Sequence, residues 1–383
     1  MISHAYQNER YLKVLEAMGK IDDVEITLIH PSRYKHETFK WSEPHTIKQI
    51  PVRVFFGSRQ GAFLYSPADL ARALDQCTPE IILHEQEVYA LSAAQISACA
   101  RRRVIPLVQF VWENIDRKLC LPRRLLRRYV LSCSAALIAG SHRAKSIHRG
   151  WGFKGPIDVM PQMGINAALV PSLGRRGAED LKICFVGRLE SCKGVDCLLQ
   201  AIALLHRRGF QVQCGIAGEG PERRPLARLA HGLGIWTMVH FCGFLSEARV
   251  QHLLRTCDAL VLPSRRTKHW QEQFGLVLAE AMAHATIAVG SKTGAIPEVI
   301  GLEELLFAEN DVDGLTEILG RLAIDSGFYQ RSQLVLWERA REQFEAPKIA
   351  SRKISFLARV LAKQEAPARE TVPLSTTLEA GSR

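Results

Sequence analysis

The chain alternates short apolar segments with amphipathic ones, and this alternation constrains its fold more than any other feature. In the first half, apolar runs at 24–30, 81–84, 104–111 and 135–139 predict β-strands. Between and around them, segments at 8–18, 91–101, 123–132 and 143–149 carry apolar residues at helical spacing. Strands that alternate with helices form parallel sheets through right-handed crossovers. The first half therefore predicts a doubly wound α/β domain.

The second half repeats this rhythm after a segment rich in glycine and proline at 163–180, which predicts a linker. Strands are predicted at 182–186, 211–217, 237–241, 259–262 and 287–289, and helices at 195–207, 221–233, 246–256, 274–284, 313–324 and 328–343. A chain of 383 residues is longer than a single hydrophobic core usually accommodates, so we predict two domains. Their expected ranges are 1–165 and 166–347, followed by a helix over 348–364 and a disordered tail over 365–383.

Composition excludes several classes of protein. No run of eighteen uncharged apolar residues occurs, so no segment is predicted to span a membrane. The first residues lack the basic and apolar regions of a signal peptide, and we expect a cytoplasmic protein. The ten cysteines include no Cys-x-x-Cys pair and several lie in apolar runs, which favours free thiols over disulfides or zinc ligands.

The net charge of +11 is uneven, because residues 1–165 hold 23 Lys and Arg against 15 Asp and Glu. Such a surface favours anionic partners such as lipid headgroups, phosphates or nucleic acid. Four arginines, at 123, 124, 127 and 128, lie on one side of a predicted helix. They suit either peripheral contact with an anionic membrane or a solvated face. No basic motif is interleaved with aromatic residues, so nucleic-acid binding is not predicted.

Ligands of open parallel sheets bind beyond the carboxyl ends of the strands, so the segments that follow strands are where a site is expected. After the strand at 182–186, the sequence Gly187-Arg188-Leu189-Glu190-Ser191-Cys192-Lys193-Gly194 places a guanidinium and an ammonium at the start of a helix. Such a pair suits a pyrophosphate. A solvated basic loop is the alternative.

Two further segments are rich in glycine. Gly218-Glu219-Gly220-Pro221 follows the strand at 211–217 but lacks the third glycine of a dinucleotide-binding motif. It fits a cofactor loop weakly and a tight turn before a helix better. The segment at 293–298, Thr-Gly-Ala-Ile-Pro-Glu, is either a small-residue turn that lets backbone approach a ligand or a plain loop.

Two glutamates stand eight residues apart after the strand at 259–262. Glu272 precedes a predicted helix and Glu280 lies inside it, with apolar residues between them. The backbone amides near Gly275 lie at the positive end of that helix. Because Glu280 is followed by Ala-Met-Ala, a buried and functional carboxylate is favoured over a surface one.

In register, these motifs resemble those of the retaining glycosyltransferases of family 4, which have the GT-B fold of two Rossmann-like domains facing across a cleft. The resemblance is specific over about 182–306 and diffuse in the first half. The motifs that carry it are Gly187-Arg188-Leu189…Lys193-Gly194, Gly218-x-Gly220-Pro221, Phe241-x-Gly243, Pro263-Ser264, Glu272-x7-Glu280 and Gly294-x-x-Pro297-Glu298.

The resemblance implies an enzyme of the hexosyltransferase type, active in polysaccharide or glycolipid biosynthesis. It would move a sugar from a nucleoside diphosphate to a glycan or lipid-linked acceptor. Residues 166–347 would bind the donor and residues 1–165 the acceptor. Arg188 and Lys193 would hold the diphosphate, Glu280 the ribose and Glu272 the sugar. Phe244 and Leu245 would lie beside the nucleobase. The remaining donor-side residues would be Gly187, Gly218 and Gly220, together with the backbone near sugar and phosphate at Gln273, Phe274, Gly275, Leu276 and Val277.

The chemistry agrees with these roles. Negative charge develops on the departing diphosphate, where fixed cations and helix N-termini stabilise the transition state. Arg188 and Lys193 would thus take the place of a metal ion, and we expect neither metal nor cofactor. No carboxylate stands out as a nucleophile, which favours front-face attack assisted by the leaving phosphate.

The first half departs from the family pattern. The opening strand is reduced to about 1–3, the following loop lacks glycine, and the start of the protein is expected upstream or truncated. Trp112-Glu113-Asn114 stands where many relatives carry a histidine. Contacts to acceptor or sugar by His4, Glu85, Trp112 or Glu113 are therefore open, with surface roles as the alternative. A catalytically inactive nucleotide-sugar-binding or scaffold protein of the same fold is the second hypothesis.

Overall fold

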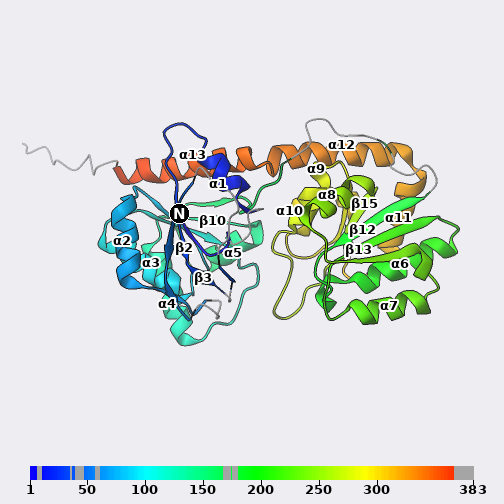
Figure 1. The fold of residues 1–383 in the computed structure, drawn as a ribbon, viewed down its shortest axis with the longest axis horizontal. Coiled ribbons are helices and arrows are strands. Elements are labelled where there is room, and N and C mark those ends of the chain that lie inside the picture. Colours follow the sequence, from blue (N-terminus) through cyan, green and yellow to red (C-terminus); the bar gives the residue numbers. More distant parts are fainter. Residues whose placement is uncertain are drawn as a thin grey trace, which may run out of the picture.

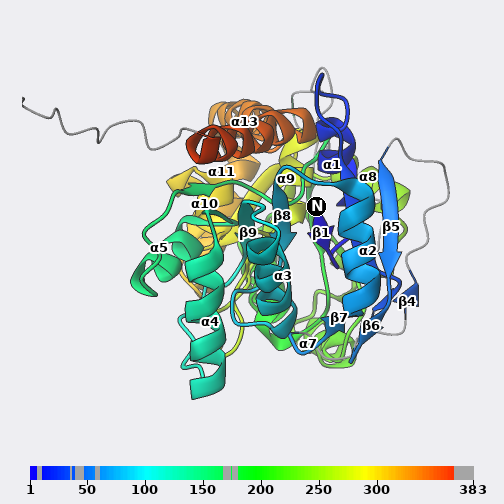
Figure 2. The ribbon, with the colours of Figure 1, turned by 90° about the vertical axis from the view of Figure 1, so that its left-hand side faces the viewer.

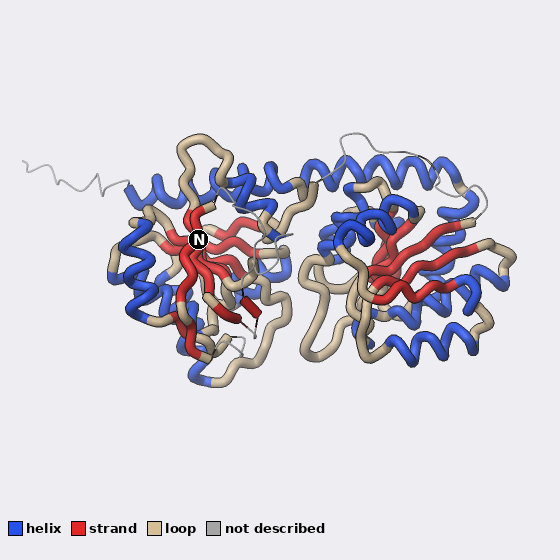
Figure 3. The backbone as a smooth tube through the Cα atoms, in the orientation of Figure 1, coloured by secondary structure: helices blue, strands red, loops and turns tan. Residues whose placement is uncertain are grey.

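The computed structural model describes residues 1–6, 11–34, 37–38, 47–56, 61–166, 174 and 180–365. Two parallel sheets form separate halves, each flanked by helices, and this confirms the predicted fold class of two Rossmann-like domains (Figures 1 and 3). No helix in the described ranges is long and apolar enough to cross a lipid bilayer.

The first domain is built on a seven-stranded parallel sheet with the order β11-β10-β9-β8-β1-β2-β5. Its strands are β1 (Ile2–Ser3), β2 (Thr27–Pro31), β5 (Lys48–Val52), β8 (Ile82–Glu85), β9 (Leu107–Val111), β10 (Ala136–Ala139) and β11 (Ile157–Val159). Two small hairpins add β3 (Arg33–Tyr34) with β4 (Glu37–Thr38), and β6 (Val54–Phe55) with β7 (Leu64–Tyr65). The helices are α1 (Lys13–Met18), α2 (Pro67–Cys77), α3 (Leu91–Arg102), α4 (Leu121–Cys133) and α5 (His142–Gly150); Figure 2 shows α2, α3 and α4 in front of the sheet.

The second domain has a six-stranded parallel sheet with the order β14-β13-β12-β15-β16-β17. Its strands are β12 (Leu181–Val186), β13 (Val212–Ala217), β14 (Val239–Gly243), β15 (Ala259–Leu262), β16 (Ile287–Ser291) and β17 (Leu306–Phe307). Its helices are α6 (Val195–Arg207), α7 (Arg223–Gly232), α8 (Glu247–Thr256), α9 (Leu276–Ala283), α10 (Ile296–Ile300), α11 (Val312–Ile324) and α12 (Ser326–Gln343), with 3-10 turns at Ser191–Lys193, Trp236–Met238 and Glu303–Leu305.

The last helix, α13 (Ala346–Glu365), leaves the second domain and packs against α1 of the first (Figure 1). The two places where the chain passes between domains are joined: Ile165 N–H donates to the Phe344 carbonyl and Ala346 N–H donates to the Ile165 carbonyl, at 2.9 and 3.0 Å. Lys353 of α13 is fully buried in the first domain, where its ammonium donates to the Gln162 carbonyl at 3.0 Å. The first domain therefore includes a segment from the far end of the sequence.

Several elements differ from the sequence-based expectation, among them the unpredicted strands β11 and β17 and the two hairpins. The structure forms α2 where none was predicted, although Pro67 at its first turn is a common start for a helix. It also adds β5, an edge strand whose Pro51 and mostly exposed side chains hide the usual strand pattern. Finally, the segment predicted as a turn at 293–298 runs into the short helix α10. The interior strands were recognisable because their side chains are buried on both faces.

All ten cysteines are free, as their placement in the sequence predicts. Four of them are buried in the core of the second domain: Cys184, Cys197, Cys214 and Cys257. Burial raises the pKa of the Cys197 thiol to about 11, so this sulfur stays protonated at neutral pH and packs as a small apolar group.

Candidate active site

The candidate site lies at the carboxyl edge of the second sheet. Strands β12 and β15 are neighbours, with Ile183 paired to Ala259, so the loops that follow them start side by side. A backbone hydrogen bond from Arg265 N–H to the Cys192 carbonyl, at 2.8 Å, joins these two loops. Gly194 also keeps them close, because a Cβ at this position would lie 2.0 Å from the Pro263 carbonyl oxygen.

The two loops bring together Lys193 and Glu272, which are 79 residues apart. The Lys193 Nζ lies 2.7 Å from Oε2 of Glu272 and 4.5 Å from the centre of the Trp270 ring. Ser264 Oγ donates to the same carboxylate oxygen at 3.4 Å. The side chains of the pair are 17% and 12% exposed, so ammonium and carboxylate face each other in a sheltered place. An anionic ligand would compete with Glu272 for this ammonium.

The backbone of Glu272 is held as firmly as its side chain. Its carbonyl oxygen accepts from Ala295 N–H at 3.0 Å and from the Asn114 amide nitrogen of the first domain at 2.8 Å. Gly294 packs directly on it, because a Cβ at Gly294 would lie 2.1 Å from this oxygen. The small-residue segment at 293–298 therefore positions the Glu272 backbone, and this role does not depend on contact with a ligand.

Helix α9 begins just after Glu272. Gly275 starts it in the left-handed conformation, with φ of 77°, and the first N–H groups of the helix follow at Leu276 and Val277. Such N–H groups have no acceptor within the helix and favour a negative charge. Glu280, on the fifth residue of α9, is 5% exposed. Gln273 is exposed, whereas the Phe274 ring packs on Phe344, with centroids 5.5 Å apart.

Arg188 is placed differently from Lys193. Its side chain is 77% exposed and lies 2.9 Å from Glu190. In this conformation its guanidinium pairs with Glu190 instead of Glu272. Of the three residues that the sequence analysis grouped, the described structure brings only Lys193 and Glu272 into contact. A long, exposed guanidinium remains free to turn toward a ligand.

The glycines near these loops have a packing role. Gly218, at φ of 141°, sits where a Cβ would lie 1.8 Å from the Gly187 carbonyl oxygen. A Cβ at Gly220 would lie 2.3 Å from the Leu189 carbonyl oxygen. The loops after β12 and β13 thus touch backbone to backbone, and only glycine fits there. Farther along the edge, Phe244 is 84% exposed and Leu245 is half-buried against the core.

The first-domain candidates lie in surroundings that the sequence did not reveal. Glu85 is completely buried: its carboxylate accepts from Ser3, Tyr6 and Gln162 at 2.8, 3.0 and 2.7 Å. Burial is the largest influence on its pKa and raises it, whereas the nearby Lys353 ammonium opposes that rise. In this conformation the Glu85 carboxylate is enclosed by the first domain and hydrogen-bonded within it.

Glu113 is also buried, and its carboxylate is already hydrogen-bonded. It is 4% exposed and accepts from the Tyr89 hydroxyl at 2.5 Å and from Arg117 Nε at 2.6 Å. The Trp112 indole donates to Gln162 at 2.9 Å. His4 is half-buried among the rings of Tyr34, Phe63 and Trp112, with centroids 4.9, 5.8 and 6.4 Å away. Glu113 is therefore buried and paired in this conformation, whereas the rings of His4 and Trp112 lie in one aromatic cluster, and acceptor contact by these residues stays a prediction.

Sequence reasoning missed the residues that connect the domains, chiefly Asn114, Arg117 and Gln271. The Gln271 side-chain amide donates to the Asn114 carbonyl at 2.6 Å, and Arg117 Nη2 donates to the His269 carbonyl at 3.0 Å. Their only signal was position, since the segment at 112–114 follows a strand of a parallel sheet. Amide side chains in loops otherwise look like ordinary solvated residues.

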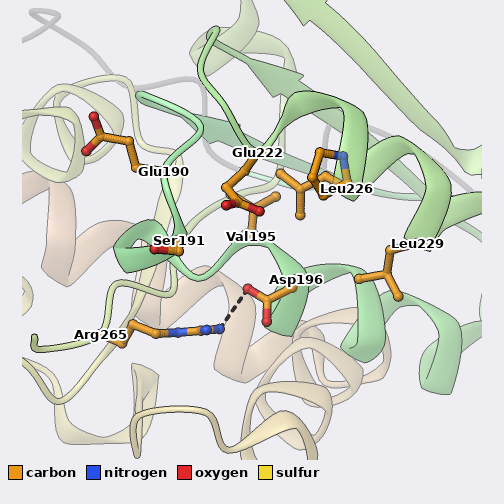
Figure 4. Close-up of a pocket in the computed structure, with 9 residues that line it drawn as sticks. Glu190, Ser191, Val195, Asp196, Glu222, Leu226, Leu229 and Arg265 are labelled. Atoms are coloured by element: carbon orange, nitrogen blue, oxygen red, sulfur yellow. Dashed lines mark hydrogen bonds and ion pairs between the residues drawn. The ribbon is translucent and has the colours of Figure 1, made fainter.

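Two small cavities flank the site. One of about 200 Å³ lies between the start of α6, α7 and Arg265, whose guanidinium lies 2.7 Å from Asp196 (Figure 4). The other, of about 160 Å³, lies between the domains and is lined by His142, Phe274 and Glu298 among others. Each is smaller than the roughly 300–1,000 Å³ typical of small-molecule sites. Neither is lined by Lys193 or Glu272.

The described residues contain no cluster of three or more His, Cys, Asp or Glu side chains able to hold a metal ion. One Asp-x-Asp sequence does occur, at 311–313. There the Asp311 carboxylate accepts from Gly314 N–H at 2.8 Å and caps α11, which gives Asp311 a structural role.

Comparison with known proteins bears on this geometry. Residues 174–342 match the family model of glycosyl transferases group 1. The match covers the second domain, which holds Lys193, Glu272 and Glu280. Glycogen synthase of Mycobacterium tuberculosis is 32% identical over 191 residues, which cover 49% of this chain and 45% of that protein. An MMP alpha-(1->4)-mannosyltransferase of Mycolicibacterium hassiacum is 32% identical over 174 residues, covering 45% and 41%. The chain thus matches less than half the length of these relatives.

Solved structures extend the likeness to both domains. Sucrose-phosphate synthase from Thermosynechococcus elongatus superposes with a TM-score of 0.71 at 17% identity, covering 94% of this chain and 98% of that one. HepE of Anabaena in complex with UDP gives 0.70 at 16% identity, with the same coverage. At this identity the likeness establishes the fold, which is GT-B.

Proposed function

We propose that the protein is a retaining glycosyltransferase that moves a hexose from a nucleoside diphosphate sugar to a glycan or lipid-linked acceptor. The observation that carries the proposal is the sheltered Lys193–Glu272 pair, formed by neighbouring loops at the carboxyl edge of the second sheet. The match of this domain to group 1 glycosyltransferases supports transfer from a nucleotide sugar. Glycogen synthase and a mannosyltransferase among the relatives support a hexose as the sugar.

In the proposed mechanism, the donor diphosphate takes over Lys193 and draws in the exposed Arg188, while the first N–H groups of α9 face its negative charge. Glu272, released from Lys193, then accepts hydrogen bonds from sugar hydroxyls, and Glu280 binds the ribose. The bond between the anomeric carbon and the diphosphate oxygen breaks as the acceptor oxygen bonds to the same face of the sugar. The acceptor proton passes to the departing phosphate oxygen, so atoms and charge balance without a protein nucleophile.

Metal independence is part of the proposal. The charge that develops on the diphosphate would be stabilised by Lys193 and the α9 terminus, which the fold holds in place, and by Arg188 once the donor has drawn it in. A chelator should therefore leave turnover unchanged. Loss of activity in EDTA that returns with a divalent cation would contradict this part and leave the transfer itself standing.

The test measures transfer and hydrolysis with a panel of UDP- and GDP-sugars. Lys193→Ala and Glu280→Ala should each reduce turnover by about two orders of magnitude or more, since each removes a group held against the donor. Lys292→Ala is the matched control, because this lysine pairs with Glu303 at the surface of the same domain. Circular dichroism checks that all variants fold. Full activity of both site variants would refute the assignment. Binding of a nucleotide sugar by the wild type without transfer or hydrolysis would favour the inactive binding protein of the same fold.

We also propose that α4 and the adjoining β6–β7 hairpin make peripheral contact with an anionic membrane. Leu121, Leu125, Phe55 and Phe56 are 66%, 55%, 54% and 69% exposed. The arginines expected on one face of α4 divide between two roles. Arg124 and Arg128 are exposed, whereas Arg123 and Arg127 lie over the rings of Tyr89 and Trp151 at 5.7 and 4.6 Å. Exposed leucines beside exposed arginines suit an anionic lipid surface.

Co-sedimentation with vesicles tests this contact. Wild type should pellet with phosphatidylglycerol vesicles and not with phosphatidylcholine alone, and the double variant Leu121→Ser/Leu125→Ser should lose the binding. Ile324→Ser is the control, because Ile324 is 75% exposed in the second domain. Equal binding by the α4 variant and the control would contradict the proposal.

A further inference from the structure

The loop that follows β9 in the first domain reaches across and touches the loop that carries Glu272. Asn114 makes two hydrogen bonds there: its side-chain amide donates to the Glu272 carbonyl at 2.8 Å, and its own carbonyl accepts from the Gln271 side chain at 2.6 Å. Asn114 and Gln271 are 2% and 8% exposed. The contact is therefore a buried, reciprocal junction between the domains.

The loop that bears Asn114 is itself fixed. Glu113 is gripped by Tyr89 and Arg117, and Arg117 extends a second nitrogen to the His269 carbonyl of the opposite domain at 3.0 Å. On the other side, Glu87 accepts from Trp112 N–H at 2.8 Å. These hydrogen bonds fix the loop on both sides of Asn114, so Asn114 moves together with the first domain.

The Glu272 carbonyl is a shared acceptor. It receives Ala295 N–H from its own domain and the Asn114 amide from the other, while the carboxylate of the same residue holds Lys193. If the domains separate, the carbonyl keeps only the Ala295 bond, and the peptide and side chain of Glu272 gain freedom. A misplacement of about 1 Å at a catalytic group can cost roughly 100-fold in rate.

We infer that Asn114 is a positioning residue that holds Glu272 in productive geometry only when the two domains are docked. The first domain would thereby contribute to the geometry of the donor site through the Glu272 backbone. This inference rests on the proposed function for its effect on rate, but the junction itself is tested independently of turnover.

The test uses the full chain with Asn114→Ala and Asn114→Asp, which remove the donated hydrogen bond, the second with little change of shape. Gln95→Ala is the matched control, because the Gln95 side chain makes two bonds to the Tyr65 backbone within the first domain. Both Asn114 variants should lower kcat about 10- to 100-fold. The Kd for UDP or GDP, whichever the wild type binds, should change less than about threefold, since those contacts lie in the second domain. The control should keep its kcat.

Amide hydrogen exchange gives the second readout. In both Asn114 variants, exchange at residues 269–275 and at Ala295 should become faster than in wild type and in Gln95→Ala. Unchanged kcat together with unchanged exchange would overturn the inference. If the wild type turns over no nucleotide sugar, the proposed function fails, and the exchange experiment alone then decides whether Asn114 positions the Glu272 loop.

Discussion

Substituting Gly294 by alanine should move Glu272 without touching it. Gly294 has φ of 55°, where an L side chain costs roughly 1–2 kcal/mol. The new Cβ would lie 2.1 Å from the Glu272 carbonyl oxygen, well inside the 3.0 Å that real contacts respect. Since both groups belong to backbone, the clash cannot be relieved by a rotamer change. Overpacking of this kind costs about 1–3 kcal/mol, so the total loss of stability should be about 2–5 kcal/mol.

Gly209→Ala separates the two causes. Gly209 has φ of 87° and no atom within 4 Å of the added Cβ, so it reports backbone strain alone. Urea unfolding of both variants should show Gly294→Ala to be the less stable by about 1–3 kcal/mol. Donor turnover should fall by about 100-fold only in Gly294→Ala, because the Glu272 backbone must retreat to relieve the clash. Equal stability of the two variants, with full activity in Gly294→Ala, would refute the reasoning.

Two further predictions concern buried charges in the first domain. Lys353→Met should lower the free energy of unfolding in urea by about 3 kcal/mol, because it leaves the buried Glu85 without its nearby cation. Adding Glu85→Gln to this variant should recover part of the loss. No recovery would mean that the two groups are not coupled. Burial, with a smaller contribution from Glu113, raises the pKa of Glu87 from 4.5 to about 8. Between these pH values the folded state binds more protons than the unfolded state, so the stability of the protein falls as pH rises. Relative to wild type, Glu87→Gln should therefore gain stability by up to about 1.4 kcal/mol per pH unit across this window and level off above pH 8, and a pH-independent difference would contradict the raised pKa.

The sequence allowed the fold to be predicted because buried parallel strands are continuous apolar runs. The strand at 259–262 and the helix at 195–207 have in the structure the bounds that the pattern predicts. Strands at the edge of a sheet, such as β5, were not predicted, because their exposed side chains do not form the apolar pattern of a buried strand. The match of residues 174–342 to a family model lies where the motifs were also most specific.

The candidate site was only partly predictable. The loops bearing Lys193 and Glu272 could be placed together because both follow strands of one parallel sheet. The contact between Asn114 and Glu272 depends on how two domains dock, and no local pattern encodes that. Glu85 and Lys353 are likewise buried near each other although 268 positions separate them, and from the sequence alone each resembles a surface charge.

The paired crossing at Ile165, Phe344 and Ala346 limits how the two halves can move. Two reciprocal backbone hydrogen bonds bind the outgoing and returning chains there, and Gly164 packs so closely that a Cβ would lie 2.7 Å from the Ala346 Cα. A relative rotation of the two halves would keep these bonds only if its axis passed close to this crossing. The sequence distance between the joined segments, about 180 residues, makes this crossing a long-range connection between the two halves.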